Sequence, residues 1–320
     1  MRAGATLATL TLVVMGVLLG WAWAWPANDR SDGGLDYTGL AGDIDPAPLD
    51  TYQARDGAQL GYRAYPAPNS DRLVLILHGS AAESRYLVPL AQELADADVA
   101  NVATPDLRGH GPNPPRRGDV DDEDQLERDL VDLIAHLSET WPVRETVVIG
   151  HSSGGGLAVR LAGGDDGSDI AGYGLLAPYL GHDAPSTRPG SGGWAQANVG
   201  RIILIEMLES VGIDALSGAE VVRFQVDDSV RDGFETDAYS SRLQRAMEPR
   251  EWQADLQAAQ APILLVAGRE DRNMIAEEYE SAMGFHGGQH SVHLLDGVGH
   301  LDILHDEETI DLVTDFVRGF

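Results

Sequence analysis

Residues 147–156 read VVIGHSSGGG, so an apolar run is followed directly by two serines among four glycines. A short run rich in valine and isoleucine is typical of a buried strand. The residues after it fit the pattern Gly-x-Ser-x-Gly, in which a nucleophilic serine lies on a sharp turn between a strand and a helix. We therefore predict that Ser152 is an exposed nucleophile, and that Gly150, His151 and Gly154 shape its turn. Small neighbours let the strand and the helix approach closely.

A nucleophilic serine needs a general base and a carboxylate that orients this base, and in one hydrolase order both follow the serine along the chain. Asp271 comes just after the apolar run 262–268, and His300 follows the run 291–297. Sites in open parallel sheets form at the carboxyl ends of the strands. We therefore predict Asp271 as the acid and His300 as the base. The alternatives are Glu270 for the acid and, for the base, His293 within a predicted strand and His305 at the expected start of the last helix.

Attack by a serine also creates an oxyanion, which needs hydrogen-bond donors. The amide of Ser153 is one candidate, because it lies at the expected start of a helix. The loop after the apolar run 73–79 supplies the other, since the amide of Ser80 follows His78 and Gly79 there. We predict Ser80 and Ser153 as the oxyanion donors, and a structural role for His78.

Strand-like and helical patterns alternate along the chain. Leucines from Leu126 to Leu137 keep a period of 3.6 residues, and so do the apolar residues from Ile310 to Val317. Such alternation predicts an α/β fold with a mostly parallel central sheet and helices on both faces. The expected strands are 73–79, 146–150, 173–178, 262–268 and 291–297.

Residues 179–260 hold too few strand patterns to belong to the central sheet, and they predict a mainly helical cap. Within them, residues 198–213 form a helix candidate with apolar residues around much of its circumference. Burial against the core is the usual reason for such a pattern. The alternative is that part of this surface, including Ile205, lines a pocket for an acyl chain.

The first 25 residues differ from the rest. Residues 3–25 carry no charge and are long enough to cross a bilayer as a helix. Arg2 precedes them, so the positive-inside rule places the N-terminus in the cytoplasm and the rest of the chain outside it. We expect a membrane anchor, or alternatively a signal peptide cleaved after Ala24, which would release a secreted protein. Residues 26–50 are then a linker, and residues 51–320 form the globular domain.

Composition excludes several classes of partner. The chain has 51 acidic residues against 22 basic ones, and its net charge of −29 argues against binding to nucleic acid. There is no cysteine, which excludes disulfides and thiolate metal sites. His286, His290 and His293 are spaced across two glycines and have no companion carboxylate. We therefore expect no metal and no cofactor.

The segments HGS, PDLRGHG, GHSSGG, GRED and GVGH occur in the order found in α/β-hydrolases. Over roughly Asp56 to Phe320 the chain most resembles the branch of monoacylglycerol lipases, lysophospholipases and serine aminopeptidases. One departure is the pair Pro112 and Asn113 after RGHG, where relatives carry a small polar residue. The resemblance implies the α/β-hydrolase fold and the same roles for Ser152, Asp271, His300, Ser80 and Ser153.

The activity implied by the resemblance is hydrolysis of a carboxylic ester, lipid-like in character, through an acyl-enzyme and without a cofactor. Two alternatives remain. The same triad serves peptidases, because the pocket rather than the triad selects esters or amides. A catalytically silent hydrolase fold could instead act as a binding module.

Overall fold

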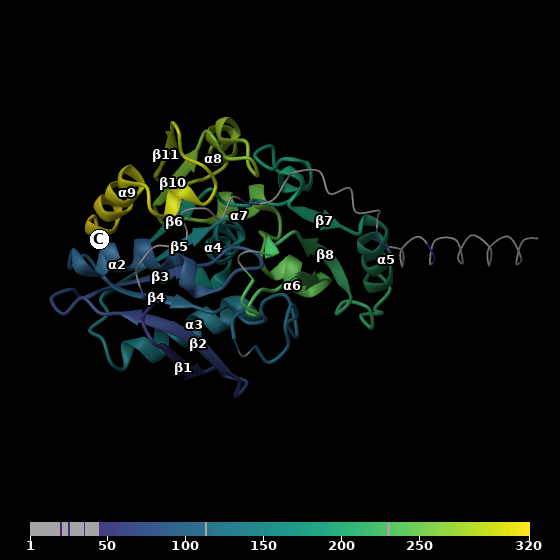
Figure 1. Cartoon of the computed structure of the whole chain (residues 1–320), viewed down its shortest axis with the longest axis horizontal. Helices are drawn as coiled ribbons and strands as arrows, with labels where there is room; N and C mark the ends of the chain where they lie inside the picture. Colours follow the sequence, from purple (N-terminus) through teal and green to yellow (C-terminus); the bar gives the residue numbers. More distant parts are fainter. Residues whose placement is uncertain (1–19, 21–24, 26–34, 36–44, 113, 229–230) are drawn as a thin grey trace, which may run out of the picture.

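The computed structural model describes residues 20, 25, 35, 45–112, 114–228 and 231–320. At its centre lies an eight-stranded sheet with the order β1-β2-β4-β3-β5-β6-β10-β11 (Figure 1). β2 pairs antiparallel with β1 and β4, and all other neighbours in this sheet are parallel. The strands are β1 (Leu49–Gln53), β2 (Gln59–Tyr65), β3 (Arg72–Leu77), β4 (Asn101–Pro105), β5 (Glu145–His151), β6 (Gly172–Leu176), β10 (Ile263–Gly268) and β11 (His290–Leu295).

The predicted mostly parallel sheet is confirmed, and its central strands are buried on both faces. In β3, Leu73, Leu75 and Leu77 belong to one hydrophobic cluster, while Val74 and Ile76 belong to the other. This alternation explains why the strand is a continuous apolar run, since successive side chains of a strand point to opposite faces.

Helices cover both faces of the sheet. One cluster takes in α2 (Val88–Asp96) and α9 (Glu307–Arg318), and the other takes in α3 (Gln125–Ser138), α4 (Ser153–Gly163), α7 (Trp252–Ala258) and α8 (Tyr279–Met283). The expected start of the last helix at His305 is wrong, because the Asp306 side chain accepts a hydrogen bond from the Thr309 amide and caps α9.

The insertion between β6 and β10 differs from the expected, mainly helical cap. It contains a second, antiparallel sheet with the order β7-β8-β9 besides its helices. These strands are too short for alternation to be recognised in the sequence. Aromatic contacts support the sheet: Trp194, just before β7, stacks on Phe224 of β8, which meets Tyr239 of β9 edge-on. The elements are β7 (Ala195–Ala197), α5 (Val199–Glu209), β8 (Glu220–Phe224), β9 (Ala238–Ser240) and α6 (Ser241–Ala246). The boundaries proposed for the cap, 179–260, stay a prediction.

The predicted anchor, residues 3–25, and most of the linker 26–50 lie outside the described residues, as does Asn113. Trp25 is described, and the centre of its indole ring lies 4.0 Å from the guanidinium carbon of Arg223 on β8. In the part of the chain that the structure describes, no helix is long and apolar enough to cross a membrane.

Candidate active site

Ser152 lies on the sharp turn between β5 and α4. Its backbone has φ 55° and ψ −121°, a conformation that costs energy for any residue other than glycine. The turn is so tight that a Cβ atom at Gly150 would lie 2.1 Å from the carbonyl oxygen of Gly154. At Gly154 itself, a Cβ atom would lie 2.5 Å from the carbonyl oxygen of Leu77. The glycines of the motif therefore allow strand and helix to pack at a distance that forces the serine outward.

Ser152, Asp271 and His300 come together from three loops at the carboxyl ends of β5, β10 and β11. His300 Nε2 lies 3.0 Å from Ser152 Oγ, and His300 Nδ1 lies 2.6 Å from Asp271 Oδ2. With the Nδ1 proton donated to the carboxylate, Nε2 is left as the acceptor for the serine hydroxyl. The other oxygen of Asp271 accepts the amides of Asn273 and Met274 at 2.7 and 2.9 Å.

The surroundings keep Asp271 ionised. Burial opposes its charged form, but the His300 ring and the two amides outweigh burial, so the pKa of Asp271 lies below its usual value. A charged carboxylate holds the imidazole in one tautomer and stabilises it when it becomes protonated.

The alternative acid and bases lie elsewhere. Glu270 is exposed to solvent next to Asp271, and His293 lies within β11. His305 is also exposed, and its Nε2 is 3.9 Å from a carboxylate oxygen of Asp302. The structure therefore brings only the first-choice acid and base to Ser152.

The two predicted oxyanion donors lie side by side. Ser80 Oγ donates to Ser153 Oγ at 2.9 Å, and both residues line the cavity that contains Ser152. Among the described residues neither backbone amide has a protein acceptor. The loop is held in a strained form, since Ala81 has φ 62° and its amide donates to the hydroxyl of Tyr239. Both amides are thus available to an oxygen atom bound in the cavity.

His78 and Gly79 form the support of this loop. His78 is fully buried, and its Nε2 accepts the amide of Leu107 at 3.0 Å, so the proton is on Nδ1 and is donated to the Gly79 carbonyl at 2.9 Å. Burial lowers the pKa of His78 and keeps its ring neutral. The ring joins the ends of β3 and β4 and does not line the cavity.

His151 connects the oxyanion loop to the base. Its Nε2 donates to the backbone carbonyl of His300 at 2.8 Å, and its Nδ1 accepts the hydroxyl of Tyr86 at 2.9 Å. The same hydroxyl accepts the Gly79 amide. Burial, and in smaller part the repulsion between its ring and that of His300 when both are protonated, lower the pKa of His151 to about 3, so it stays neutral. Sequence reasoning missed Tyr86, because a tyrosine near a helix start reads as ordinary packing.

A cavity of about 150 Å³ opens beside Ser152. Its apolar walls come mainly from the insertion and include Tyr179, Trp194, Val222, Phe224 and Met274. Its polar walls include His182, Arg188, Gln244 and Asn273. No described residue of α5 lines it, so the hypothesis that Ile205 lines an acyl pocket is wrong: Ile205 is 1% exposed and packs in the core.

The described ranges contain no group of three or more histidine, cysteine or carboxylate side chains that could hold a metal ion. The expectation that the protein binds no metal stays a prediction. The rings of His286 and His290 lie 5.6 Å apart, centre to centre, without a third partner.

The sequence model of the family described as Serine aminopeptidase, S33 (Hydrolase_4) matches residues 68–308. The chain belongs to this family. The match runs from before β3 to the start of α9, and it includes Ser152, Asp271 and His300. Membership confirms the resemblance to the α/β-hydrolases.

Several solved structures share the fold of this chain. A monoacylglycerol lipase from Paleococcus ferrophilus has 20% identity and a TM-score of 0.62, over 82% of this chain and 99% of that one. A soluble variant of monoglyceride lipase from Saccharomyces cerevisiae has 18% identity and a TM-score of 0.63, over 87% of this chain and 95% of the lipase. A bacterial membrane phospholipase A has 18% identity and a TM-score of 0.58, over 98% of this chain and 91% of the phospholipase. No curated protein sequence matches the chain significantly. At these identities the likeness confirms the α/β-hydrolase fold alone.

Proposed function

We propose that this S33-family chain hydrolyses carboxylic esters through an acyl-enzyme formed on Ser152. The observation that carries this proposal is the continuous chain of hydrogen bonds from Ser152 Oγ through His300 to Asp271, with lengths of 3.0 and 2.6 Å. It ends at a cavity with two backbone amides free to bind an oxyanion. Nucleophile, base, orienting acid and oxyanion donors therefore meet at one point, as acyl transfer requires.

The reaction follows from these positions. His300 takes the hydroxyl proton of Ser152 while Oγ attacks the ester carbonyl, and the amides of Ser80 and Ser153 donate to the oxyanion. His300 then gives the proton to the leaving alcohol oxygen, and Ser152 remains acylated. A water molecule deprotonated by the same ring releases the acid and restores the serine. Asp271 orients the ring and stays ionised throughout.

The cavity favours an ester over the amide of an aminopeptidase substrate. An aminopeptidase binds a terminal ammonium group, for which a carboxylate is the natural partner. None of the described residues that line this cavity is acidic, and Arg188 adds a positive charge. We therefore keep the peptidase as the second candidate, supported by the family description.

The size of the cavity bears on the acyl group. Its 150 Å³ is small beside the roughly 300–1,000 Å³ of typical ligand pockets. An engineered cavity of about 150 Å³ holds a single benzene molecule. We propose a short acyl group as the preferred one, at the short end of the lipid-like esters that the resemblance implies. A long chain requires the insertion to move away from the cavity.

The first experiment is labelling of the full-length protein with a fluorophosphonate, followed by peptide mapping. We expect the adduct on Ser152 and its loss in Ser152→Ala, which should also lower kcat by roughly 10⁶-fold. Ser153→Ala is the matched control, because it keeps the backbone amide and should still be labelled. Absence of labelling in the folded wild-type protein, or residual activity of Ser152→Ala above about 1%, would contradict the proposal and favour the silent binding module.

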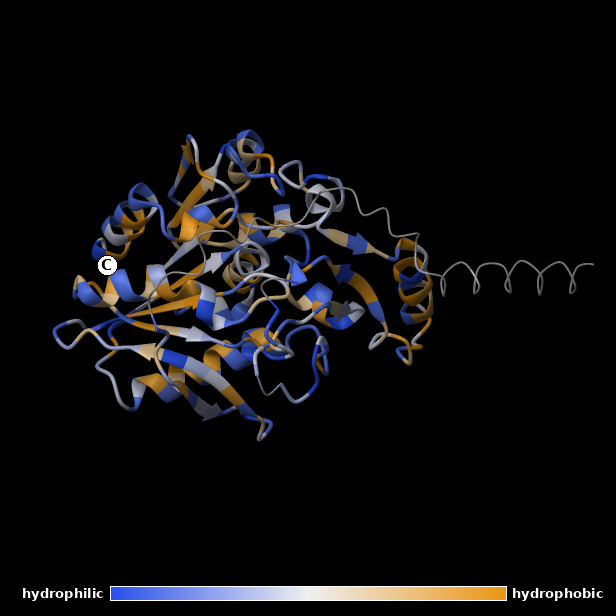
Figure 2. Ribbon diagram, viewed as in Figure 1, coloured by the Kyte–Doolittle hydropathy of each residue, from blue (hydrophilic) through white to orange (hydrophobic). Residues whose placement is uncertain are grey.

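We also propose that residues 3–25 anchor the protein in a membrane, with the N-terminus in the cytoplasm and the catalytic domain outside it. In support, Trp25 packs on Arg223 beside α5, and Figure 2 shows apolar residues along α5. Two of them, Ile203 and Met207, are 44% and 62% exposed. The membrane phospholipase A with the same fold also matches 98% of the chain.

The anchor is tested by fractionating cells that express the full chain and by measuring the mass of the mature protein. The proposal expects an uncleaved chain in the alkali-washed membrane fraction, with the domain digested by protease added from outside. A soluble protein that begins after Ala24 would instead establish a cleaved signal peptide.

A further inference from the structure

Arg188 lines the cavity beside Ser152 without a carboxylate partner. It lies in the insertion after β6, where its Nε donates to the Met274 carbonyl at 3.0 Å. Its backbone amide also donates to the Asn273 carbonyl, at 3.3 Å. The first contact holds the inner nitrogen of the guanidinium group and the second holds the backbone, while the side chain is half-buried. No hydrogen bond or ion pair of its two terminal amino groups is found within the described residues.

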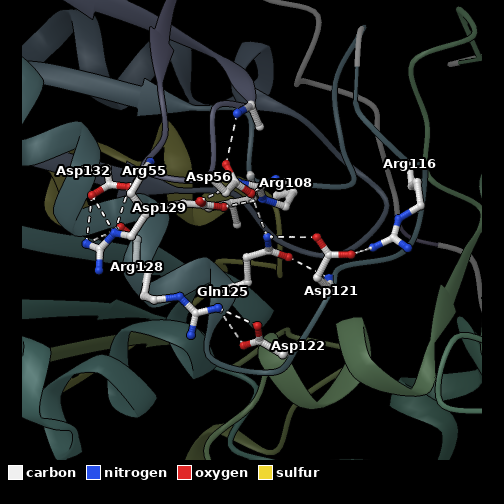
Figure 3. Close-up of polar contacts among 12 residues, drawn as sticks. Arg55, Asp56, Arg108, Arg116, Asp121, Asp122, Gln125, Arg128, Asp129 and Asp132 are labelled. Carbon is white, nitrogen blue, oxygen red and sulfur yellow. Dashed lines mark hydrogen bonds and ion pairs between the residues drawn. The ribbon is translucent and has the colours of Figure 1, made fainter. Parts of the chain in front are cut away.

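Most described arginines contact a carboxylate, although Arg63 and Arg117, like Arg188, make their hydrogen bonds to other groups. Figure 3 shows the common arrangement, in which Arg55, Arg108 and Arg128 each contact one or more aspartates. Arg108, for example, is buried and lies 2.7 Å from Asp129. The chain has more than twice as many acidic as basic residues, so a carboxylate is available to most guanidinium groups. Arg188 differs from the other described arginines because it lines the cavity that contains Ser152, where its terminal amino groups can meet a ligand.

Three carboxylates near the cavity are engaged by other groups, and Asp183, next to His182, is exposed and does not line the cavity. Asp271 lies behind His300 and accepts three hydrogen bonds. Glu277 lies near enough to Arg188 for their charges to interact, but it pairs with Arg269 at 3.1 Å. Glu248 accepts from Gln244 at 3.2 Å and does not line the cavity. An anion that enters the cavity therefore meets a positive charge and no acidic side chain on the described walls.

We propose that Arg188 is a specificity-determining residue that binds an anionic group of the ester substrate, a carboxylate or a phosphate. A guanidinium group has planar, paired donors that match either anion. Because the cavity is small, the anion lies only a few bonds from the ester carbonyl. This inference rests on the proposed ester hydrolysis and narrows its substrate to esters that carry a negative charge.

The first test compares two esters of equal chain length that differ in charge. Mono-p-nitrophenyl glutarate carries a carboxylate where p-nitrophenyl pentanoate carries a methyl group. We expect wild-type kcat/KM to favour the glutarate, and Arg188→Gln to lower the ratio of the two values by about 10- to 100-fold, the usual strength of a charge-assisted hydrogen bond. Arg188→Lys should restore part of this ratio, because it keeps the charge but not the paired donors.

A second pair of substrates distinguishes the source of the anion. 1-Butyrylglycerol 3-phosphate carries a phosphate on the alcohol side, and 1-butyrylglycerol is its neutral counterpart. If Arg188→Gln changes the ratio of kcat/KM values only for the phosphate pair, Arg188 binds a phosphate head group. If it changes the ratio only for the glutarate pair, Arg188 binds a carboxylate on the acyl side. Ratios that are the same in wild type and Arg188→Gln for both pairs overturn the inference.

Two controls separate the possible failures. Arg144→Gln removes the same charge from a side chain that is 73% exposed, just before β5 and outside the cavity walls, and should leave both ratios unchanged. Fluorophosphonate labelling and hydrolysis of the neutral esters report whether the site itself works. If wild type fails in both, the proposed function fails. If wild type is labelled and hydrolyses the neutral esters, but Arg188→Gln leaves both ratios unchanged, only the inference fails.

Discussion

The hydroxyl group of Tyr86 joins the two halves of the candidate site. It accepts the amide of Gly79 beside the oxyanion loop and donates to His151, whose other nitrogen holds the backbone of His300. Tyr86→Phe leaves one buried donor and one buried acceptor unsatisfied. We expect a loss of about 1–3 kcal/mol in the free energy of unfolding, measured by urea denaturation, together with a lower kcat. Unchanged stability and unchanged kcat would show that the chain through Tyr86 does not support the site.

Glu248 makes stability depend on pH. Burial raises its pKa from 4.5 to about 6, so the folded state favours the protonated acid. The resulting stability is fully present below pH 4.5 and is lost as the pH rises through 6. Glu248→Gln should therefore be more stable than wild type above pH 6, by at most about 2 kcal/mol, and equally stable near pH 4. Urea denaturation at both pH values measures the difference, and a constant difference would contradict this origin.

The contact between β3 and α4 sets the position of the nucleophile. At Gly154 a Cβ atom would lie 2.5 and 2.6 Å from the carbonyl oxygens of Leu77 and His78, so Gly154→Ala has to push strand and helix apart. We expect a loss of about 1–3 kcal/mol in stability and slower labelling of Ser152. Gly284→Ala is the control, since its φ of −58° suits alanine. Equal losses in the two variants would mean that the close contact is unimportant.

The apolar residues of α5 serve two different purposes. Ile205 is buried, so Ile205→Asp is expected to destabilise the fold rather than to change chain-length preference. Ile203 and Met207 are exposed, and Met207→Asp should leave urea stability and short-ester turnover unchanged. If α5 lies at a lipid surface, Met207→Asp will weaken cosedimentation of the detergent-free domain, residues 45–320, with neutral vesicles. Unchanged cosedimentation would exclude this role for α5.

The whole molecule carries a net charge of −29, whose self-repulsion opposes the compact state. Salt shortens the range of this repulsion, from about 10 Å at 0.1 M to about 3 Å at 1 M. It weakens buried ion pairs, such as Arg160 with Glu127 at 2.9 Å, much less. We therefore expect Tm to rise between 0.1 and 1 M NaCl. A fall in Tm would show that exposed ion pairs outweigh the repulsion.

The sequence by itself determined the parallel part of the sheet, the turn at Ser152 and the choice of Asp271 and His300. Strand periodicity, glycine spacing and chain order are local, and the carboxyl ends of parallel strands meet at one edge whatever the details of packing. Only the tertiary structure decided the β7-β8-β9 sheet, the position of Tyr86 and the unpaired Arg188 in the cavity. Each of these depends on contacts between segments far apart in the chain. The short strands and the two single residues have no local sequence pattern strong enough to predict such contacts.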